Sequence, residues 1–224
     1  MKRESELEFL ESNVDESILI ELYNKSYNNL EKLNEKVDRF TLYLTIVVIL
    51  FFASMNVSIE SFEIGIITIK DTSVITKILP FIFFELLYMI ITMSMHKSEL
   101  YFGVKKLGRY IYKNNYENFE IHTFQNNFID RLSLPFSFSS FGNQMVLKNG
   151  GLFSSLLGII VSIPALIIAF SPIVIGFLMM KNIYLNHFND LLGKVSFFIS
   201  LWVILTIIYT LIIWTIKNNG EELR

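Results

Sequence analysis

The chain contains no cysteine, and it is poor in proline and glycine, with 4 Pro and 10 Gly among 224 residues. The absence of cysteine excludes disulfide bonds, thiol catalysis and metal sites built on thiolates. The three histidines, His96, His122 and His187, are scattered along the chain, and no HExxH or glycine-rich phosphate motif accompanies them. We therefore expect no enzyme, no metal site and no cofactor.

Charge is also scarce, because charged residues make up 18% of the chain and the net charge is −2. Such a balance gives no support to a nucleic-acid partner. Hydrophobic residues reach 52% and fall in four runs, which are Thr41–Val57, Ile78–Met95, Leu152–Met180 and Val195–Ile216. Each run is close to or above the roughly 17–25 residues that cross a bilayer as a helix. The lipid bilayer is therefore the first expected partner.

The expected fold class is all-α: a polytopic integral membrane protein with four transmembrane helices. An amphipathic cytoplasmic helix precedes them, and a helical cytoplasmic loop lies between the second and third. The first 40 residues are too charged for a short signal peptide, so we expect Thr41–Val57 to be retained as the first span. The segments are 1–40 (cytoplasmic helix), 41–95 (first hairpin, outer loop 58–77), 96–151 (cytoplasmic loop), 152–216 (second hairpin) and 217–224 (cytoplasmic tail).

Lysine and arginine are concentrated before the first run and between the second and third. Because such residues stay on the cytoplasmic side, both termini are expected there. The Ile-, Asn- and Lys-rich composition favours an AT-rich genome and a bacterial inner (plasma) membrane.

Residues 14–39 are predicted to form one helix that runs directly into the first span. Asp15 or Asn13 is suited to cap its start. Ile20, Tyr23, Tyr27, Leu30 and Val37 follow a rough 3-4 repeat, which Asn34 interrupts. The repeat fits a coiled-coil contact with a cytoplasmic protein partner, and it fits equally a face that packs on this chain's own loop.

Two further segments have recognisable patterns. The Ile, Val and Thr content of residues 58–77, with a break at Lys70–Asp71, predicts a short β-hairpin. Residues 96–134 are predicted to form two helices, of which the first continues the second span. Its basic side is expected to face anionic lipid headgroups, or alternatively a nucleotide or an acidic partner; this side consists of Lys105, Lys106, Arg109 and Lys113.

A stripe of small residues runs along 151–176 with the spacing 4-3-4-3-4-3-4, which brings its members to one helix face. The members are Gly151, Ser155, Gly158, Ser162, Ala165, Ala169, Pro172 and Gly176. A small face lets another backbone approach closely. In this respect the segment is similar to the pore helices of bacterial mechanosensitive channels, and the resemblance, which covers this one helix, implies a pore-lining or gating role. The alternative is packing against the other spans of the same chain.

Glu85 is the one formal charge well inside a predicted span. A carboxylate in hydrocarbon costs several kcal/mol unless it is protonated, paired or hydrated. It is therefore a candidate ion ligand, proton carrier or path-lining charge. The structural alternative is a hydrogen bond with Tyr43, Thr45 or Thr206 on a neighbouring helix.

These features together predict a homo-oligomeric channel-like or membrane-permeabilising protein that is gated through its cytoplasmic helices. The alternative is a non-conducting membrane sensor or scaffold that recruits a soluble partner through residues 1–38 and 96–134. The sequence indicates neither the ion, the trigger, the partner nor the number of copies.

Overall fold

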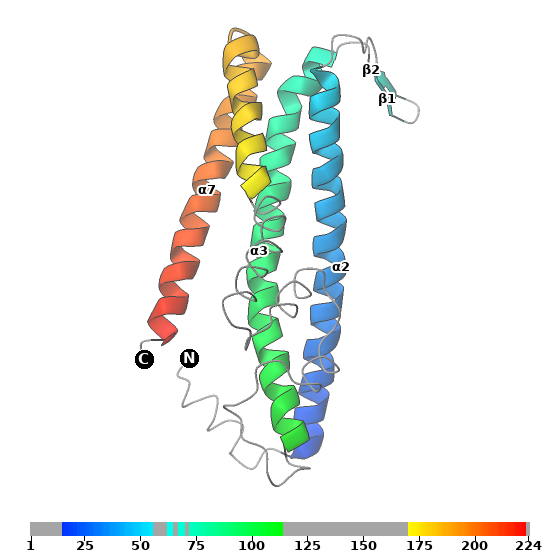
Figure 1. Ribbon diagram of the computed structural model, residues 1–224, viewed down its shortest axis with the longest axis vertical. Coiled ribbons are helices and arrows are strands. Elements are labelled where there is room, and N and C mark those ends of the chain that lie inside the picture. Colours follow the sequence, from blue (N-terminus) through cyan, green and yellow to red (C-terminus); the bar gives the residue numbers. More distant parts are fainter. Residues whose placement is uncertain (1–14, 56–61, 65–66, 70–71, 114–169, 223–224) are drawn as a thin grey trace, which may run out of the picture. The chain divides into compact units, whose positions relative to one another are not determined.

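The computed structural model describes residues 15–55, 62–64, 67–69, 72–113 and 170–222. These residues are almost entirely helical, as predicted, apart from one small hairpin (Figure 1). The elements in chain order are α2 (Glu16–Ser54), β1 (Phe62–Ile64), β2 (Ile67–Ile69), α3 (Thr72–Lys113), an α-helical segment at 170–182, the π-helix η2 (Ile183–His187) and α7 (Leu191–Glu222).

Three of the four predicted spans correspond to helices that are long and apolar enough to cross a membrane. They cover Ser17–Ser54, Ser73–Lys105 and Leu191–Lys217. The third predicted span is helical over its described part, residues 170–180. Its remaining residues, 152–169, and the second predicted cytoplasmic helix at 116–132 lie outside the described part of the chain.

The chain divides into two compact units. Unit 1 comprises Met1–Val37, Met93–Ser162 and Ile213–Arg224, and unit 2 comprises Asp38–Thr92 and Ile163–Ile212. The helices α2, α3 and α7 each contribute residues to both units.

The start of α2 follows the capping chemistry of its sequence. The backbone N–H of Ser17 donates to Oδ1 of Asp15 at 3.2 Å. This bond satisfies one of the N–H groups that a first helical turn leaves without a partner. No proline or glycine interrupts the following 39 residues, so the helix continues unbroken into the first apolar run, as predicted.

In unit 1, the amphipathic face of α2 differs in detail from the predicted repeat. Leu19, Leu30 and Asn34 are buried, whereas Ile20 is 41% exposed. Asn34, which interrupts the apolar repeat, therefore lies on the buried face. Leu19 is buried where the repeat predicted that Ile20 would be. Because this face is covered within the chain, it agrees with the interpretation in which the helix packs on its own protein.

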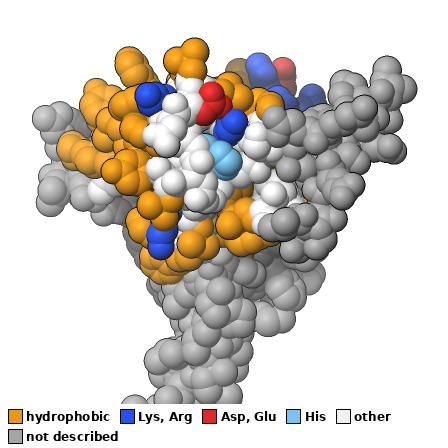
Figure 2. Space-filling view, turned by 90° about the horizontal axis from the view of Figure 1, so that it is seen from above, with side chains coloured by type: hydrophobic (Ala, Val, Ile, Leu, Met, Phe, Trp, Pro, Cys, Tyr) orange, Lys and Arg blue, Asp and Glu red, His pale blue; other side chains and the backbone are white. Residues whose placement is uncertain are grey.

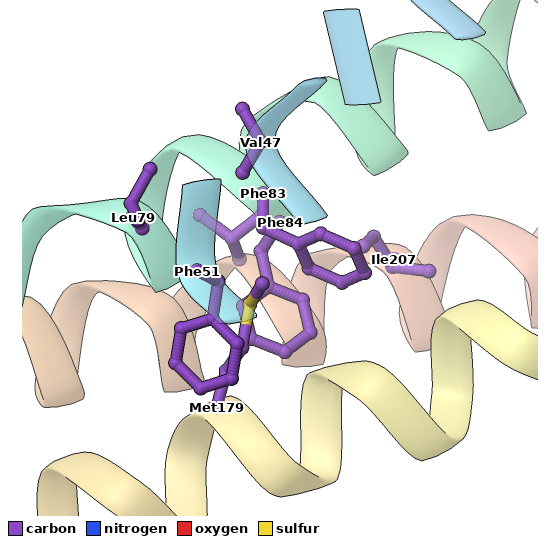
Figure 3. Packing of buried hydrophobic residues seen from close by; sticks show 8 residues of the cluster. Val47, Phe51, Leu79, Phe83, Phe84, Met179 and Ile207 are labelled. Atoms are coloured by element: carbon purple, nitrogen blue, oxygen red, sulfur yellow. The ribbon is translucent and has the colours of Figure 1, made fainter. Parts of the chain in front are cut away.

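In unit 2, side chains from four helical segments form one hydrophobic core (Figure 3). Helix α2 contributes Val47 and Phe51, and Met179 comes from the 170–182 segment. The remaining members are Leu79, Phe83 and Phe84 from α3 and Val203 and Ile207 from α7. The described part of the third predicted span thus packs together with the three long helices.

The outward surfaces of these helices are apolar. Ile49 is 61% exposed, Phe177 is 67% exposed and Trp202 is 75% exposed. Large contiguous apolar surfaces are rare on soluble proteins. The exposure of these side chains therefore fits helices whose outer faces meet lipid.

The predicted hairpin between the first two long helices is confirmed. Strands β1 and β2 pair antiparallel, with Phe62 opposite Ile69 and Ile64 opposite Ile67. Both strands precede the Lys70–Asp71 pair in the sequence, and α3 begins at Thr72.

Candidate functional site

Glu85 lies deep within the apolar part of α3. It follows Lys77 by eight residues, or about 12 Å of helix. Between Lys77 and Lys97 it is the sole Asp, Glu, Lys or Arg, and that stretch of helix measures about 30 Å, the thickness of the hydrocarbon layer. If Lys77 marks one edge of that layer, the carboxyl group of Glu85 falls near its middle.

The Glu85 side chain is half-buried, and within the described residues it forms no hydrogen bond or ion pair. Two of the hydroxyl groups predicted as hydrogen-bond partners of Glu85 instead donate to backbone carbonyls of their own helices. Thr45 donates to the carbonyl of Thr41 at 2.9 Å, and Thr206 donates to the carbonyl of Trp202 at 3.0 Å. Tyr43, the remaining candidate, is 48% exposed. The hydrogen-bonded structural role is therefore not observed in the described structure.

Glu85 lies on the face of α3 that is turned away from the core of unit 2. Leu79 and Phe83 are buried in that core, and Glu85 follows Phe83 by about 200° around the helix axis. Its neighbours one turn before and one turn after, Ile82 and Met89, are 37% and 43% exposed. The carboxyl group is thus set among outward-facing apolar side chains.

The small-residue stripe has one described position at which its packing is clear. Gly176 is buried, and a Cβ atom on it would lie 2.9 Å from Cζ of Phe84 and 3.4 Å from Cε1 of Phe83. The absence of a side chain at Gly176 is what allows these two aromatic rings to lie against the helix. At this position the small face packs within the chain, against α3.

Of the other stripe residues, Pro172 is half-buried in the 170–182 segment. The remaining positions lie outside the described residues; they are Gly151, Ser155, Gly158, Ser162, Ala165 and Ala169.

A polar cluster connects α3 with the start of α7 in unit 2. Nζ of Lys77 lies 2.8 Å from Oδ2 of Asp190, with the lysine side chain largely buried. Asp190 also accepts hydrogen bonds from the backbone N–H groups of Leu191 and Leu192, so it caps α7. The hydrogen bond from Lys77 lowers the pKa of the Asp190 carboxyl most, burial opposes this shift, and the charge of Lys77 and then the two backbone bonds lower the pKa further. One carboxylate therefore joins two helices.

Four further residues lie at the same connection. Burial and the nearby charge of Lys77 lower the pKa of His187, while Asp190 opposes this shift. Nδ2 of Asn186 donates to Oδ1 of Asn182 at 2.6 Å, within the turn that includes η2. Gly193 in the first turn of α7 lies against the backbone carbonyl of His187, where a side chain would not fit. Figure 2 shows acidic, lysine and histidine side chains gathered at this end, beside hydrophobic ones.

The predicted basic side occupies the part of α3 that belongs to unit 1. Lys105 is half-buried and has an interaction partner. Lys106, Arg109 and Lys113 belong to the helix, but their side chains lie outside the described part of the structure. Among the described residues, no group of three or more His, Asp or Glu is arranged to hold a metal ion.

The ion pair between Lys77 and Asp190 was not predicted, because the two residues are 113 positions apart in the sequence. Asn189–Asp190 ahead of Leu191–Leu192 is a helix-start signal that sequence reasoning could have used. Nothing in the sequence identifies Lys77 as the partner.

Comparisons with protein-family models, with curated proteins and with solved structures find no match for this chain.

Proposed function

We propose that this chain is an integral membrane protein that crosses the bilayer four times with both termini in the cytoplasm, in a bacterial inner membrane. Three helices of sufficient length and apolarity support this topology, and so does the packing of Met179 into their common core. The basic residues before the first span and after the second favour the cytoplasmic placement of the termini.

Within that membrane, we propose a channel-like function for an assembly of several copies. The observation that carries the proposal is Glu85: a half-buried carboxyl group within the apolar stretch of α3 between Lys77 and Lys97, on the face turned away from the core, without a partner among the described residues. An intramembrane carboxylate of this kind is stabilised by water, by a cation or by a polar group from another molecule. A path between copies would supply such surroundings, and the carboxylate would favour cations or protons.

The packing of Gly176 bears on which helix would line that path. Since Gly176 already contacts Phe84 of the same chain, this end of the small stripe is occupied. We therefore assign the lining to the outward face of α3, and we assign the described end of the stripe to packing within one chain.

The scaffold hypothesis places the soluble partner on residues 1–38 and 96–134. Leu19, Leu30 and Asn34 on one face of α2 are buried, so this face supports packing within the chain more than recruitment of a partner. Ion flux through liposomes that contain the purified protein tests the proposal. Flux that depends on Glu85 would support it, and the absence of flux from inserted, folded protein would contradict it.

A further inference from the structure

We infer that copies of this chain meet through one face of α3, around a common axis on which their Glu85 carboxyl groups lie together. This inference rests on the proposed homo-oligomer and names the surface that joins its members. The face consists of Ile78, Ile82, Glu85, Met89 and Thr92, and all five belong to unit 2.

The spacing of these residues is 4-3-4-3, which keeps them on one stripe of the helix. Two parallel helices that pack with a left-handed crossing meet along a stripe with this period. We call the five residues of this stripe the seam. Copies inserted in the same membrane direction present α3 in parallel, so the counterparts of each seam residue lie at the same level around the axis. The seam is therefore self-complementary in the way that a symmetric assembly requires.

Within the described part of the chain, the apolar members of the seam belong neither to the core of unit 2 nor to the side chains packed against it. The opposite side of α3, with Leu79, Phe83 and Phe84, is buried in the core. Ile78 and Ile82 are each 37% exposed and Met89 is 43% exposed, while Glu85 and Thr92 are half-buried. Thr92 donates to the carbonyls of Tyr88 and Met89 at 3.0 Å, so its hydroxyl proton is already used.

The polar side chain of Glu85 favours a second copy of the chain over lipid as the neighbour of the seam. Acyl chains offer no hydrogen-bond donor or acceptor, whereas polar side chains within transmembrane helices hydrogen-bond across helix interfaces. At the level of Glu85 on this face, the neighbouring residues Ile82 and Met89 are apolar and provide no partner. A second copy brings a carboxyl group to the same level by symmetry, and the pair can share a proton in a hydrogen bond.

The absence of cysteine allows a direct test by single-cysteine crosslinking of purified protein in liposomes. Ile82→Cys and Met89→Cys place a thiol on the seam. Leu205→Cys and Ile173→Cys are matched controls at more exposed positions, 59% and 65%, on other helices. Random collision would crosslink the more exposed control positions faster, whereas assembly through α3 would crosslink the seam positions faster. We expect disulfide-linked dimers to form about tenfold faster at the seam, because assembly raises the effective thiol concentration.

A second comparison in the Ile82→Cys background isolates Glu85. Glu85→Gln retains a hydrogen-bonding amide and should keep the crosslinking rate, whereas Glu85→Leu removes the polar contact and should lower it severalfold. Equal rates at seam and control positions, or no crosslinks at either seam position, would overturn the inference. Flux without seam crosslinks would contradict this interface alone, whereas seam crosslinks without flux would contradict the channel-like function alone.

Discussion

Gly176 and Phe84 are in direct contact: a Cβ atom on the glycine would lie 2.9 Å from Cζ of the phenylalanine ring. Both residues are buried, so the ring has little room to move. Gly176→Ala should therefore lower the free energy of unfolding by about 1–3 kcal/mol, as overpacked cores do. Unfolding in detergent, followed by circular dichroism, measures this change.

Gly103→Ala is the matched control, because it makes the same substitution in a helix with nothing within 4 Å of the new Cβ atom. Replacing an unhindered helical glycine by alanine should raise stability by up to about 1 kcal/mol. A stabilising Gly176→Ala would contradict the close packing of the 170–182 segment against α3.

The ion pair between Lys77 and Asp190 should stabilise the connection between α3 and α7. Asp190→Asn removes the charge but keeps a side chain that caps helices well, whereas Asp190→Ala removes both functions. We therefore expect thermal stability to decrease from the unmodified protein to Asp190→Asn and again to Asp190→Ala. Equal losses in the two variants would show that capping by Asp190 contributes nothing.

His187 should make stability depend on pH. Its pKa in the folded protein is below the ordinary value of 6.5, mainly because of burial. The unfolded chain then binds the proton more readily, so stability falls as the pH drops through about 6.5 toward the folded-state pKa. His187→Gln should flatten the change in melting temperature between pH 7.5 and pH 5. Asp190 does not contribute in this window, because its lowered pKa lies below 3.8.

Ser200 is fully buried, and its hydroxyl lacks a hydrogen-bond partner within the described structure. An unsatisfied buried hydroxyl costs about 1–3 kcal/mol, so Ser200→Ala should leave stability unchanged or raise it. Thermal unfolding of the detergent-solubilised variant measures this. A clear loss of stability would mean that the hydroxyl has a partner in the assembled protein.

The elements that depend on local sequence were predictable, whereas the contacts between distant segments were not. Three of the hydrophobic runs predicted the three long helices, and Asp15 was a predicted cap at the start of α2. The partner of Gly176 could not be predicted, because a 3-4 stripe indicates that a helix packs closely but carries no information about the neighbour. The same holds for Lys77 and Asp190, whose distance depends on how α3 and α7 pack together.

For Glu85, too, its position in an apolar run was predictable from the sequence, whereas the direction in which it faces was not. The sequence identifies it as an unusual charge, since the cost of a carboxylate in hydrocarbon depends on composition and position along the helix. The direction in which it faces, away from Leu79 and Phe83, follows only when the core is known. Together with the packing of Gly176 against Phe84, that direction is the reason for proposing a path along α3 and not along the third predicted span.

The most direct test of the channel-like function is the cation selectivity of ion flux through liposomes, compared between the unmodified protein and Glu85→Gln. Glu21→Gln is the matched control, because it removes the same charge from an exposed position on α2 outside the first predicted span. We expect flux from the unmodified protein and from Glu21→Gln. In Glu85→Gln, cation selectivity should fall by about tenfold, the effect of losing about 1.4 kcal/mol of interaction. Equal selectivity in all three proteins, or no flux from any of them when folded and inserted, would contradict the account.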